Sequence, residues 1–117
     1  MTISPRIRTS IYERDGNFCV ACGTQNELTI HHRVNRGSGG SKLFDSKAFL
    51  LTMCNFCNTR MESDADFREL ALVYGWKLLR NTKPPIDPTT VAVKYTNSGE
   101  WFLLDNEGKR KQVTHGK

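Results

Sequence analysis

The chain has 117 residues, of which 38% are hydrophobic, and a formal net charge of +5 at pH 7. This length fits one small domain without a large apolar core, and such a domain usually needs a metal or disulfides to stabilise it. The lack of any apolar run of about 18 residues excludes a membrane-spanning helix, and the basic charge favours a polyanionic partner such as nucleic acid.

The N-terminal residues predict a short helix that ends in a turn. Ile7 and Ile11 are four residues apart, a spacing that places both side chains on one helix face. The segment Asp15-Gly16-Asn17 then stops the helix and turns the chain. The first cysteine pair, Cys19-Val20-Ala21-Cys22, follows, and Gly23 lets the backbone turn tightly after it.

A short strand is predicted for residues 28–32. Leu28 and Ile30 share one face of this strand, and the alternation of side chains sends His31 and His32 to opposite faces. We therefore expect the two histidines to have different roles.

A polar, glycine-rich loop follows over residues 33–42. A flexible connector has the same composition and is one interpretation of this loop. Its basic residues are also candidates for contact with nucleic-acid phosphates, as is one arginine further along the chain. The predicted contacts are Arg33, Arg36, Lys42 and Arg60, and the alternative for each is a solvated surface charge.

The middle of the chain predicts a strand followed by helix. The apolar residues 49–53 favour a core strand or extended segment that enters the second cysteine pair, Cys54-Asn55-Phe56-Cys57. A helical turn continues from this pair to about Ser63. Asp64 can cap a further helix, and Gly75 occupies the position after its last turn. The apolar stripe of that helix, which we expect in the core, consists of Phe67, Leu70, Ala71 and Tyr74.

The last third of the chain begins with the proline-rich residues 81–90, which we interpret as an extended connector because proline cannot continue a helix or a sheet interior. Residues 91–95 and 100–104 flank the turn sequence Thr96-Asn97-Ser98-Gly99, a pattern typical of a hairpin. Lys109-Arg110-Lys111 and the residues after it are predicted to form a basic tail. The chain is therefore predicted to divide into three parts. These are an N-terminal domain over residues 1–80, the connector over residues 81–90, and a β-hairpin appendage with a basic tail over residues 91–117.

The four cysteines form two Cys-x-x-Cys pairs, at a spacing that suits a tetrahedral structural zinc ion. The predicted ligands are Cys19, Cys22, Cys54 and Cys57. Two disulfides are one alternative, but residues 1–6 lack the apolar stretch of a secretory signal, so we expect a reducing cytoplasm, which favours metal binding. A thioredoxin-like redox site is the other alternative, and it lacks a βαβ pattern around either pair.

Five short motifs stand in order between residues 14 and 63. They are Arg14-Asp15-Gly16, Cys19-x-x-Cys22-Gly23, Leu28-x-x-His31-His32, Arg36-Gly37-Ser38-Gly39-Gly40, and Leu50-Leu51-x-Met53-Cys54-x-x-Cys57. This combination resembles the HNH endonuclease family, particularly its small phage-encoded members. The resemblance implies an α+β fold with a ββα-metal core, also called a His-Me finger, stapled by the zinc site. Residues 1–80 would then be a zinc-stapled nuclease domain.

The resemblance also implies a metal-dependent DNA endonuclease that hydrolyses phosphodiester bonds, by nicking or by double-strand cleavage, and leaves 5′-phosphate and 3′-hydroxyl ends. It makes His31 a ligand of the catalytic cation and His32 the general base that activates water. Asn58 takes the position of the family's last histidine, and because an amide oxygen suits a hard cation, we expect Mg²⁺ or Mn²⁺ there. Phage endonucleases of this kind often work beside DNA-packaging machinery, so a packaging or host protein is a further expected partner.

Phe49 departs from the family pattern, which has an asparagine five residues before the second cysteine pair. In the family that asparagine braces the loop that carries the histidines, and phenylalanine cannot make its hydrogen bonds. Asn35, Asp45 or Ser46 could replace it. The alternative function is a zinc module with weak or no catalytic activity that binds nucleic acid or a protein partner.

Overall fold

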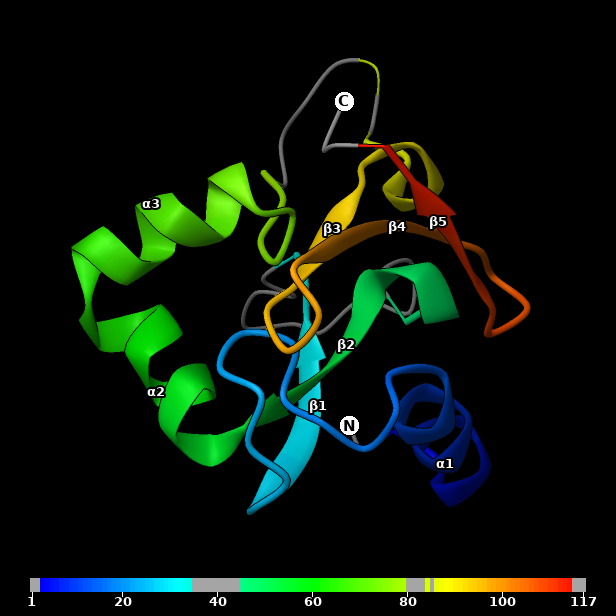
Figure 1. Cartoon of the computed structure of the whole chain (residues 1–117), viewed down its shortest axis with the longest axis horizontal. Helices are drawn as coiled ribbons and strands as arrows, with labels where there is room; N and C mark the ends of the chain where they lie inside the picture. The colour runs from blue at the N-terminus through cyan, green and yellow to red at the C-terminus, as the bar shows by residue number, and fades with distance from the viewer. Residues whose placement is uncertain (1–2, 35–44, 80–83, 85, 115–117) are drawn as a thin grey trace.

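The computed structural model describes residues 3–34, 45–79, 84 and 86–114. Its first element is helix α1 (Pro5–Arg14), drawn in dark blue in Figure 1. Ser4 caps this helix, because the Ile7 amide donates to Ser4 Oγ (3.3 Å). Gly16 and Asn17 then adopt positive φ angles of 75° and 62° and turn the chain away. The predicted helix and its stop are confirmed.

Strands β1 (Leu28–His32) and β2 (Leu50–Cys54) form an antiparallel pair at the centre of the molecule (Figure 1). Leu28 pairs with Cys54 at one end of the ladder, and His32 pairs with Leu50 at the other. β1 has the predicted bounds, and every residue of β2 is buried, which confirms a core strand. The histidines and the second cysteine pair therefore lie at opposite ends of the ladder.

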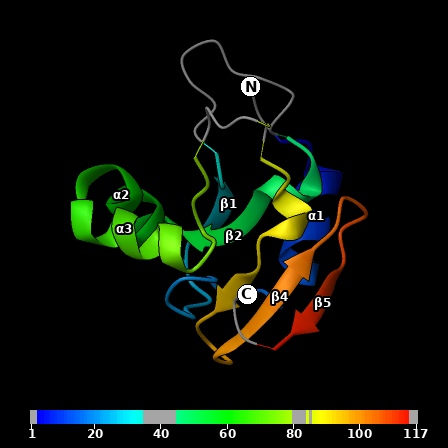
Figure 2. The same cartoon turned by 90° about the horizontal axis from the view of Figure 1, so that it is seen from above.

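Two helices, α2 (Asn55–Ser63) and α3 (Ala65–Val73), follow β2. Asp64 separates them and caps α3 as predicted, because its side chain accepts hydrogen bonds from the amides of Asp66 and Phe67 (3.1 Å each). Figures 1 and 2 show α2 and α3 on one side of the β1–β2 pair and α1 on the other. α2 contacts both strands, so the order strand, strand, helix brings this helix beside the histidines.

The chain leaves α3 through Gly75, whose φ of 79° confirms the glycine predicted after the last turn. A Cβ atom at this position would collide with the carbonyl oxygen of Ala92. The close approach of the C-terminal segment to the end of α3 therefore requires glycine.

Three C-terminal strands form an antiparallel sheet in the order β3-β4-β5. They are β3 (Val93–Tyr95), β4 (Glu100–Leu104) and β5 (Arg110–Val113). The predicted hairpin is confirmed, but the predicted basic tail is wrong from residue 110 to residue 113, which pair with β4. Backbone pairing holds this exposed strand in place, and charged side chains are common on such sheet edges.

Two short 3₁₀ helices complete the described structure, η2 (Lys47–Phe49) before β2 and η3 (Pro88–Thr90) before β3. The predicted extended connector is therefore wrong at residues 88–90. Asp87 caps η3 by accepting hydrogen bonds from the amide and hydroxyl of Thr89 (3.0 and 2.7 Å). Residues 80–83 and 85 of the predicted connector lie outside the described residues.

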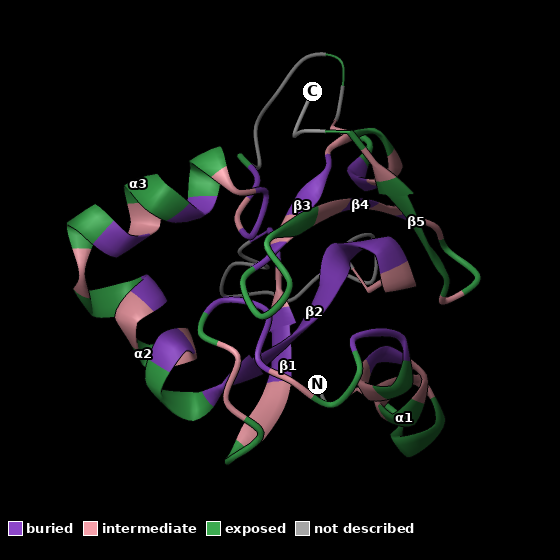
Figure 3. Ribbon diagram, viewed as in Figure 1, coloured by how far each residue is buried: buried purple, intermediate pink, exposed green. Residues whose placement is uncertain are grey.

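The principal core joins the N-terminal and C-terminal parts of the chain (Figure 3). Its buried members include Cys19, Leu51, Phe67, Trp76, Tyr95, Phe102 and Leu104. The protein is therefore a small α+β fold whose C-terminal sheet contributes to the same core instead of standing apart as an appendage. No helix among the described residues is long and apolar enough to cross a membrane.

A buried polar cluster ties α1 to both sheets. Arg14 Nε lies 2.7 Å from Asp15 Oδ1, and the Arg14 guanidinium also donates to the carbonyl of Leu50 (2.6 Å). Asp15 accepts further hydrogen bonds from the Thr52 amide (2.9 Å) and from the Tyr95 hydroxyl. Burial raises the pKa of Tyr95, and the Asp15 carboxylate raises it further.

Candidate metal and catalytic sites

The two cysteine pairs meet at one end of the β1–β2 ladder. The four Sγ atoms of Cys19, Cys22, Cys54 and Cys57 lie within 4.8 Å of one another, and all four cysteines are free thiols. The Sγ atoms of Cys22 and Cys54 are 3.7 Å apart. Tetrahedral zinc with Zn–S distances of about 2.3 Å needs sulfurs about 3.8 Å apart, so the cluster fits this ion. The four cysteines could therefore hold a metal ion such as zinc.

Backbone hydrogen bonds fix the first cysteine pair. The Gly23 amide donates to the Cys19 carbonyl (2.8 Å) and closes the turn, which Gly23 leaves with a φ of 83°. The Val20 amide donates to the Thr52 carbonyl of β2 (3.0 Å), and the Thr96 amide donates to the Val20 carbonyl (3.0 Å). The pair is thus held between β2 and the turn that joins β3 to β4.

The close approach of the thiols changes the pKa of Cys19 and of Cys57 in opposite directions. The thiol of Cys57 donates a hydrogen bond to Cys19 and lowers the pKa of Cys19 to about 5, and the same contact raises the pKa of Cys57. The Cys57 amide also donates to Cys54 Sγ (3.4 Å). Several thiolates this close repel one another, and a bound divalent cation removes that repulsion because it binds the thiolate form.

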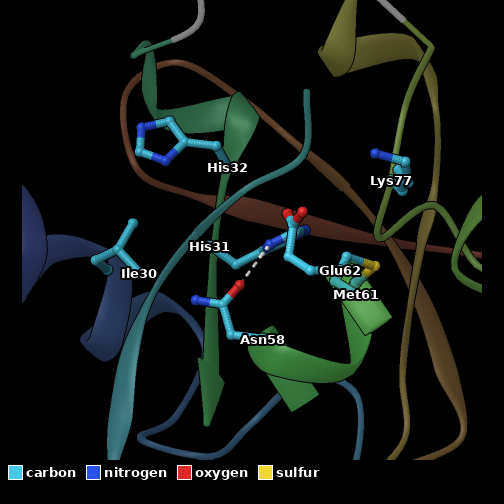
Figure 4. A pocket seen from close by; sticks show the side chains of 7 residues that line it. All are labelled: Ile30, His31, His32, Asn58, Met61, Glu62 and Lys77. Carbon is cyan, nitrogen blue, oxygen red and sulfur yellow. Dashed lines mark hydrogen bonds between the residues drawn. The ribbon is translucent and has the colours of Figure 1, made fainter. Parts of the chain in front are cut away.

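His31 and Asn58 meet in a pocket between β1 and α2 (Figure 4). The Nδ1 atom of His31 lies 3.3 Å from Asn58 Oδ1, and its Nε2 atom lies 2.9 Å from the carbonyl oxygen of Trp76. The His31 side chain is buried, and burial lowers its pKa to about 4. The ring is therefore neutral at pH 7.

The Trp76 carbonyl selects the tautomer of His31. A carbonyl oxygen can only accept, so the neutral ring carries its hydrogen on Nε2 and its lone pair on Nδ1. This lone pair faces the side-chain oxygen of Asn58, which is also an acceptor, so the two atoms repel each other. The contact becomes favourable when a cation binds both atoms, or when the Asn58 amide turns its nitrogen toward the ring. Histidines that bind metals commonly donate their other ring nitrogen to a carbonyl. The pair therefore suits a divalent cation.

His32 lies at the end of β1, and its Nε2 atom is 3.1 Å from Asp45 Oδ1. Figure 4 shows its imidazole directed away from the His31–Asn58 pair, which confirms that the two histidines differ in direction and contacts. A carboxylate partner orients an imidazole and stabilises its protonated form, which suits a general base. Asp45 is one of the residues that the sequence offers in place of the asparagine absent at position 49. Another, Asn35, lies outside the described residues.

The pocket has a volume of ≈ 250 Å³ and is lined by both histidines and Asn58. It is also lined by Glu62 and Lys77, two charged residues that the sequence did not single out. Glu62 follows Asn58 on α2 by four residues, a helical spacing that could have revealed it. Lys77 comes from the segment after α3, and no local pattern marks it.

Arg33 is not available for contact with phosphates, which corrects the prediction from sequence, because its side chain is fully buried. Its guanidinium donates to four backbone carbonyls, those of Ala48 (2.8 Å), Gly75 (2.9 Å), Val91 (3.0 Å) and Pro88 (3.1 Å). Burial lowers the pKa of Arg33 to about 9, so the group stays charged at pH 7. The carbonyl dipoles compensate its charge, since none of the described carboxylates pairs with it.

Arg33 also anchors the chain directly after the histidines through its backbone. Its amide donates to the Phe49 carbonyl (2.7 Å), and its carbonyl accepts from the Leu78 amide (2.7 Å). Phe49 packs with Val34 and Leu78 in a small buried cluster. Hydrogen bonds of Arg33 and apolar packing of Phe49 therefore fix the chain directly after the histidines. The phenylalanine side chain itself cannot supply hydrogen bonds for this purpose.

Arg60, a predicted phosphate contact within the described residues, does not line the pocket. Arg60 Nη2 lies 3.3 Å from Asp64 Oδ2, and the Arg60 guanidinium stacks 4.3 Å from the centroid of the Phe67 ring. Arg36 and Lys42 lie outside the described residues. The described structure therefore brings the two histidines and Asn58 together, without a predicted basic residue beside them.

Comparisons of this chain with protein-family models, with curated proteins and with solved structures each found no match. A functional inference therefore depends on the chemistry of the two sites.

Proposed function

We propose that this chain is a metal-dependent nuclease that hydrolyses DNA phosphodiester bonds, of the HNH type that its sequence resembles. The observation that carries the proposal is the His31–Asn58 pair, whose Nδ1 and Oδ1 atoms lie 3.3 Å apart in a pocket that His32 also lines. Adjacent ligands of an octahedral cation at about 2.1 Å lie about 3 Å apart, so one ion could bind both atoms. The order β1, β2, α2 around the pair is compatible with a ββα-metal core.

A Mg²⁺ or Mn²⁺ ion held by His31 and Asn58 would stabilise the negative charge on the scissile phosphate and on the leaving 3′ oxygen. His31 suits the ligand role, because a buried ring with a pKa of about 4 is a poor base at pH 7. His32 accepts the proton of the attacking water at Nδ1, because its Nε2 donates to Asp45, which also stabilises the imidazolium. The water oxygen bonds to phosphorus as the bond to the 3′ oxygen breaks, and the leaving 3′ oxygen takes up a proton from solvent, which leaves 5′-phosphate and 3′-hydroxyl ends.

The cysteine cluster supports this site from the other end of the ladder. Cys54 ends β2 and Cys57 lies in the first turn of α2, one residue before Asn58. A zinc ion bound to all four cysteines would fix the start of α2 against β1, and with it the position of the Asn58 amide.

The test is the conversion of supercoiled plasmid to nicked or linear DNA in EDTA, Mg²⁺, Mn²⁺, Ni²⁺ and Zn²⁺. We expect cleavage that depends on Mg²⁺ or Mn²⁺ and that falls by on the order of a hundredfold or more in His32→Ala. Asn97→Ala, at an exposed position in the turn between β3 and β4, is the matched control and should cleave like the wild type. Zinc content and folding should be the same in all three proteins. Full cleavage by His32→Ala, or none by the wild type in any metal, would refute the proposal.

A second candidate function is a zinc module that binds a partner without cleaving nucleic acid. Large exposed apolar side chains favour it, namely Phe56 (69% exposed), Val73 (67%) and Leu79 (59%). Such side chains, when contiguous, mark surfaces that bind other proteins. This function predicts that the plasmid remains supercoiled in every metal while zinc is retained.

A further inference from the structure

Lys77 is the one lysine or arginine among the described residues that line the pocket. It enters from the segment after α3, whereas Asn58 and Glu62 belong to α2. Figure 4 shows its ammonium group directed into the pocket. Within the part of the chain that the structure describes, no carboxylate forms an ion pair with it. This cation therefore lies at the pocket without a carboxylate partner among the described residues.

Lys77 lines the same pocket as His31 and Asn58, the pair that we assign to a metal ion. The pocket volume of ≈ 250 Å³ leaves room between these groups. Because a water molecule takes up about 30 Å³, the pocket can admit a larger group than a single water.

The backbone that carries this lysine is fixed against His31 and Arg33 by three hydrogen bonds. The Nε atom of Arg33 donates to the Gly75 carbonyl (2.9 Å), and Nε2 of His31 donates to the Trp76 carbonyl (2.9 Å). The Leu78 amide donates to the Arg33 carbonyl (2.7 Å). These contacts lie on both sides of the lysine, so its Cα position is set relative to the His31 ring.

We propose that Lys77 binds a non-bridging oxygen of the scissile phosphodiester in the pocket that His31 and Asn58 line. An ammonium group is a compact charge with three donors, which suits a phosphate oxygen. Glu62, the carboxylate on the α2 side of the pocket, repels a phosphate and favours its placement toward Lys77. The inference rests on the proposed nuclease function and adds a substrate contact that the resemblance does not assign.

Single-turnover cleavage of a duplex oligonucleotide in Mg²⁺ and Mn²⁺ tests this contact. Lys77→Met should cleave more slowly by on the order of a hundredfold, as expected when a group that stabilises charge in the transition state is removed. Lys77→Arg, which keeps the charge, should recover most of the rate. Lys111→Met, at an exposed position on β5, removes the same charge elsewhere and should cleave like the wild type. Equal rates for Lys77→Met and Lys111→Met overturn the proposal.

The affinity for Mn²⁺ in the absence of DNA separates a lost phosphate contact from a damaged pocket. Removal of a positive charge near His31 should leave Mn²⁺ binding unchanged or make it tighter. A disturbed pocket would instead bind Mn²⁺ more weakly. Weaker binding by Lys77→Met, measured by the signal of free Mn²⁺ in electron paramagnetic resonance, overturns the role of Lys77 as a substrate contact.

Binding measurements keep this proposal distinct from the nuclease function. In the His32→Ala background, the slope of log K against log salt for duplex binding in Mg²⁺ should fall in magnitude by about 0.9 when Lys77 is replaced by methionine. An unchanged slope overturns the contact, whether or not the wild type cleaves DNA. A smaller slope together with an inactive wild type supports a contact between Lys77 and a DNA phosphate and refutes the nuclease function alone.

Discussion

Replacement of Arg33 by methionine should destabilise the protein by about 3–5 kcal/mol. The Arg33 side chain is fully buried, and its guanidinium donates to four backbone carbonyls at 2.8, 2.9, 3.0 and 3.1 Å. A hydrogen bond to a charged group contributes about 1.5–3 kcal/mol, so four of them contribute on the order of 6–12 kcal/mol. Relief of the desolvation of a buried charge, which costs several kcal/mol, offsets part of this loss.

Urea unfolding followed by tryptophan fluorescence measures this change. The free zinc concentration must be the same for all proteins, because metal that binds only the folded state raises the apparent stability. Arg6→Met, at an exposed position on α1, is the control and should stay within about 0.5 kcal/mol of the wild type. A free energy of unfolding for Arg33→Met within about 1 kcal/mol of this control would show that the four contacts do not brace the chain.

Three further predictions concern the cysteine cluster, a glycine and a buried tyrosine. Chelation of the metal should unfold the chain or lower its Tm, because metal-binding energy contributes to folding. Circular dichroism before and after zinc is restored measures this change. An unchanged Tm would contradict the prediction. Gly75→Ala should destabilise by about 3 kcal/mol or more in urea unfolding, because its φ is 79° and the added Cβ would collide with the Ala92 carbonyl. Gly99→Ala, with a φ of 73° but no atom within 4 Å of the added Cβ, isolates the collision and should cost less. Burial and the neighbouring Asp15 raise the pKa of Tyr95, so its contribution to stability is present below about pH 10 and is lost as pH rises above that value. The free energy of unfolding should therefore fall less steeply in alkali for Tyr95→Phe than for the wild type, and equal slopes would count against this assignment.

Short-range patterns in the sequence were enough to predict much of the local structure. Strand alternation alone separated the environments of His31 and His32, and the structure buries the first and leaves the second partly exposed beside Asp45. Asp64 was recognisable as a helix cap because a carboxylate can accept from the first free amides of a helix. The cysteine spacing likewise predicted a cluster that the fold brings together.

The errors concern residues whose environment is set by distant parts of the chain. Arg33 flanks a glycine-rich loop and resembles a solvated charge, yet carbonyls from three separate segments enclose it. β5 has no alternation of apolar residues, because it is an exposed edge strand held by backbone pairing with β4. Lys77 gains its place in the pocket only through contacts that join the segment after α3 to β1.

The long connection between β1 and β2 gives the cysteine cluster a second consequence. A tight turn sets the alignment of most hairpins, but residues 33–49 separate these strands. The alignment must therefore be set partly at the other end, where Cys54 faces Leu28. A slip by one residue would exchange the faces of His31 and His32. A metal ion bound by the four cysteines would therefore help to hold the two strands in this alignment, and its loss would disturb the positions of both histidines before the helices unfold.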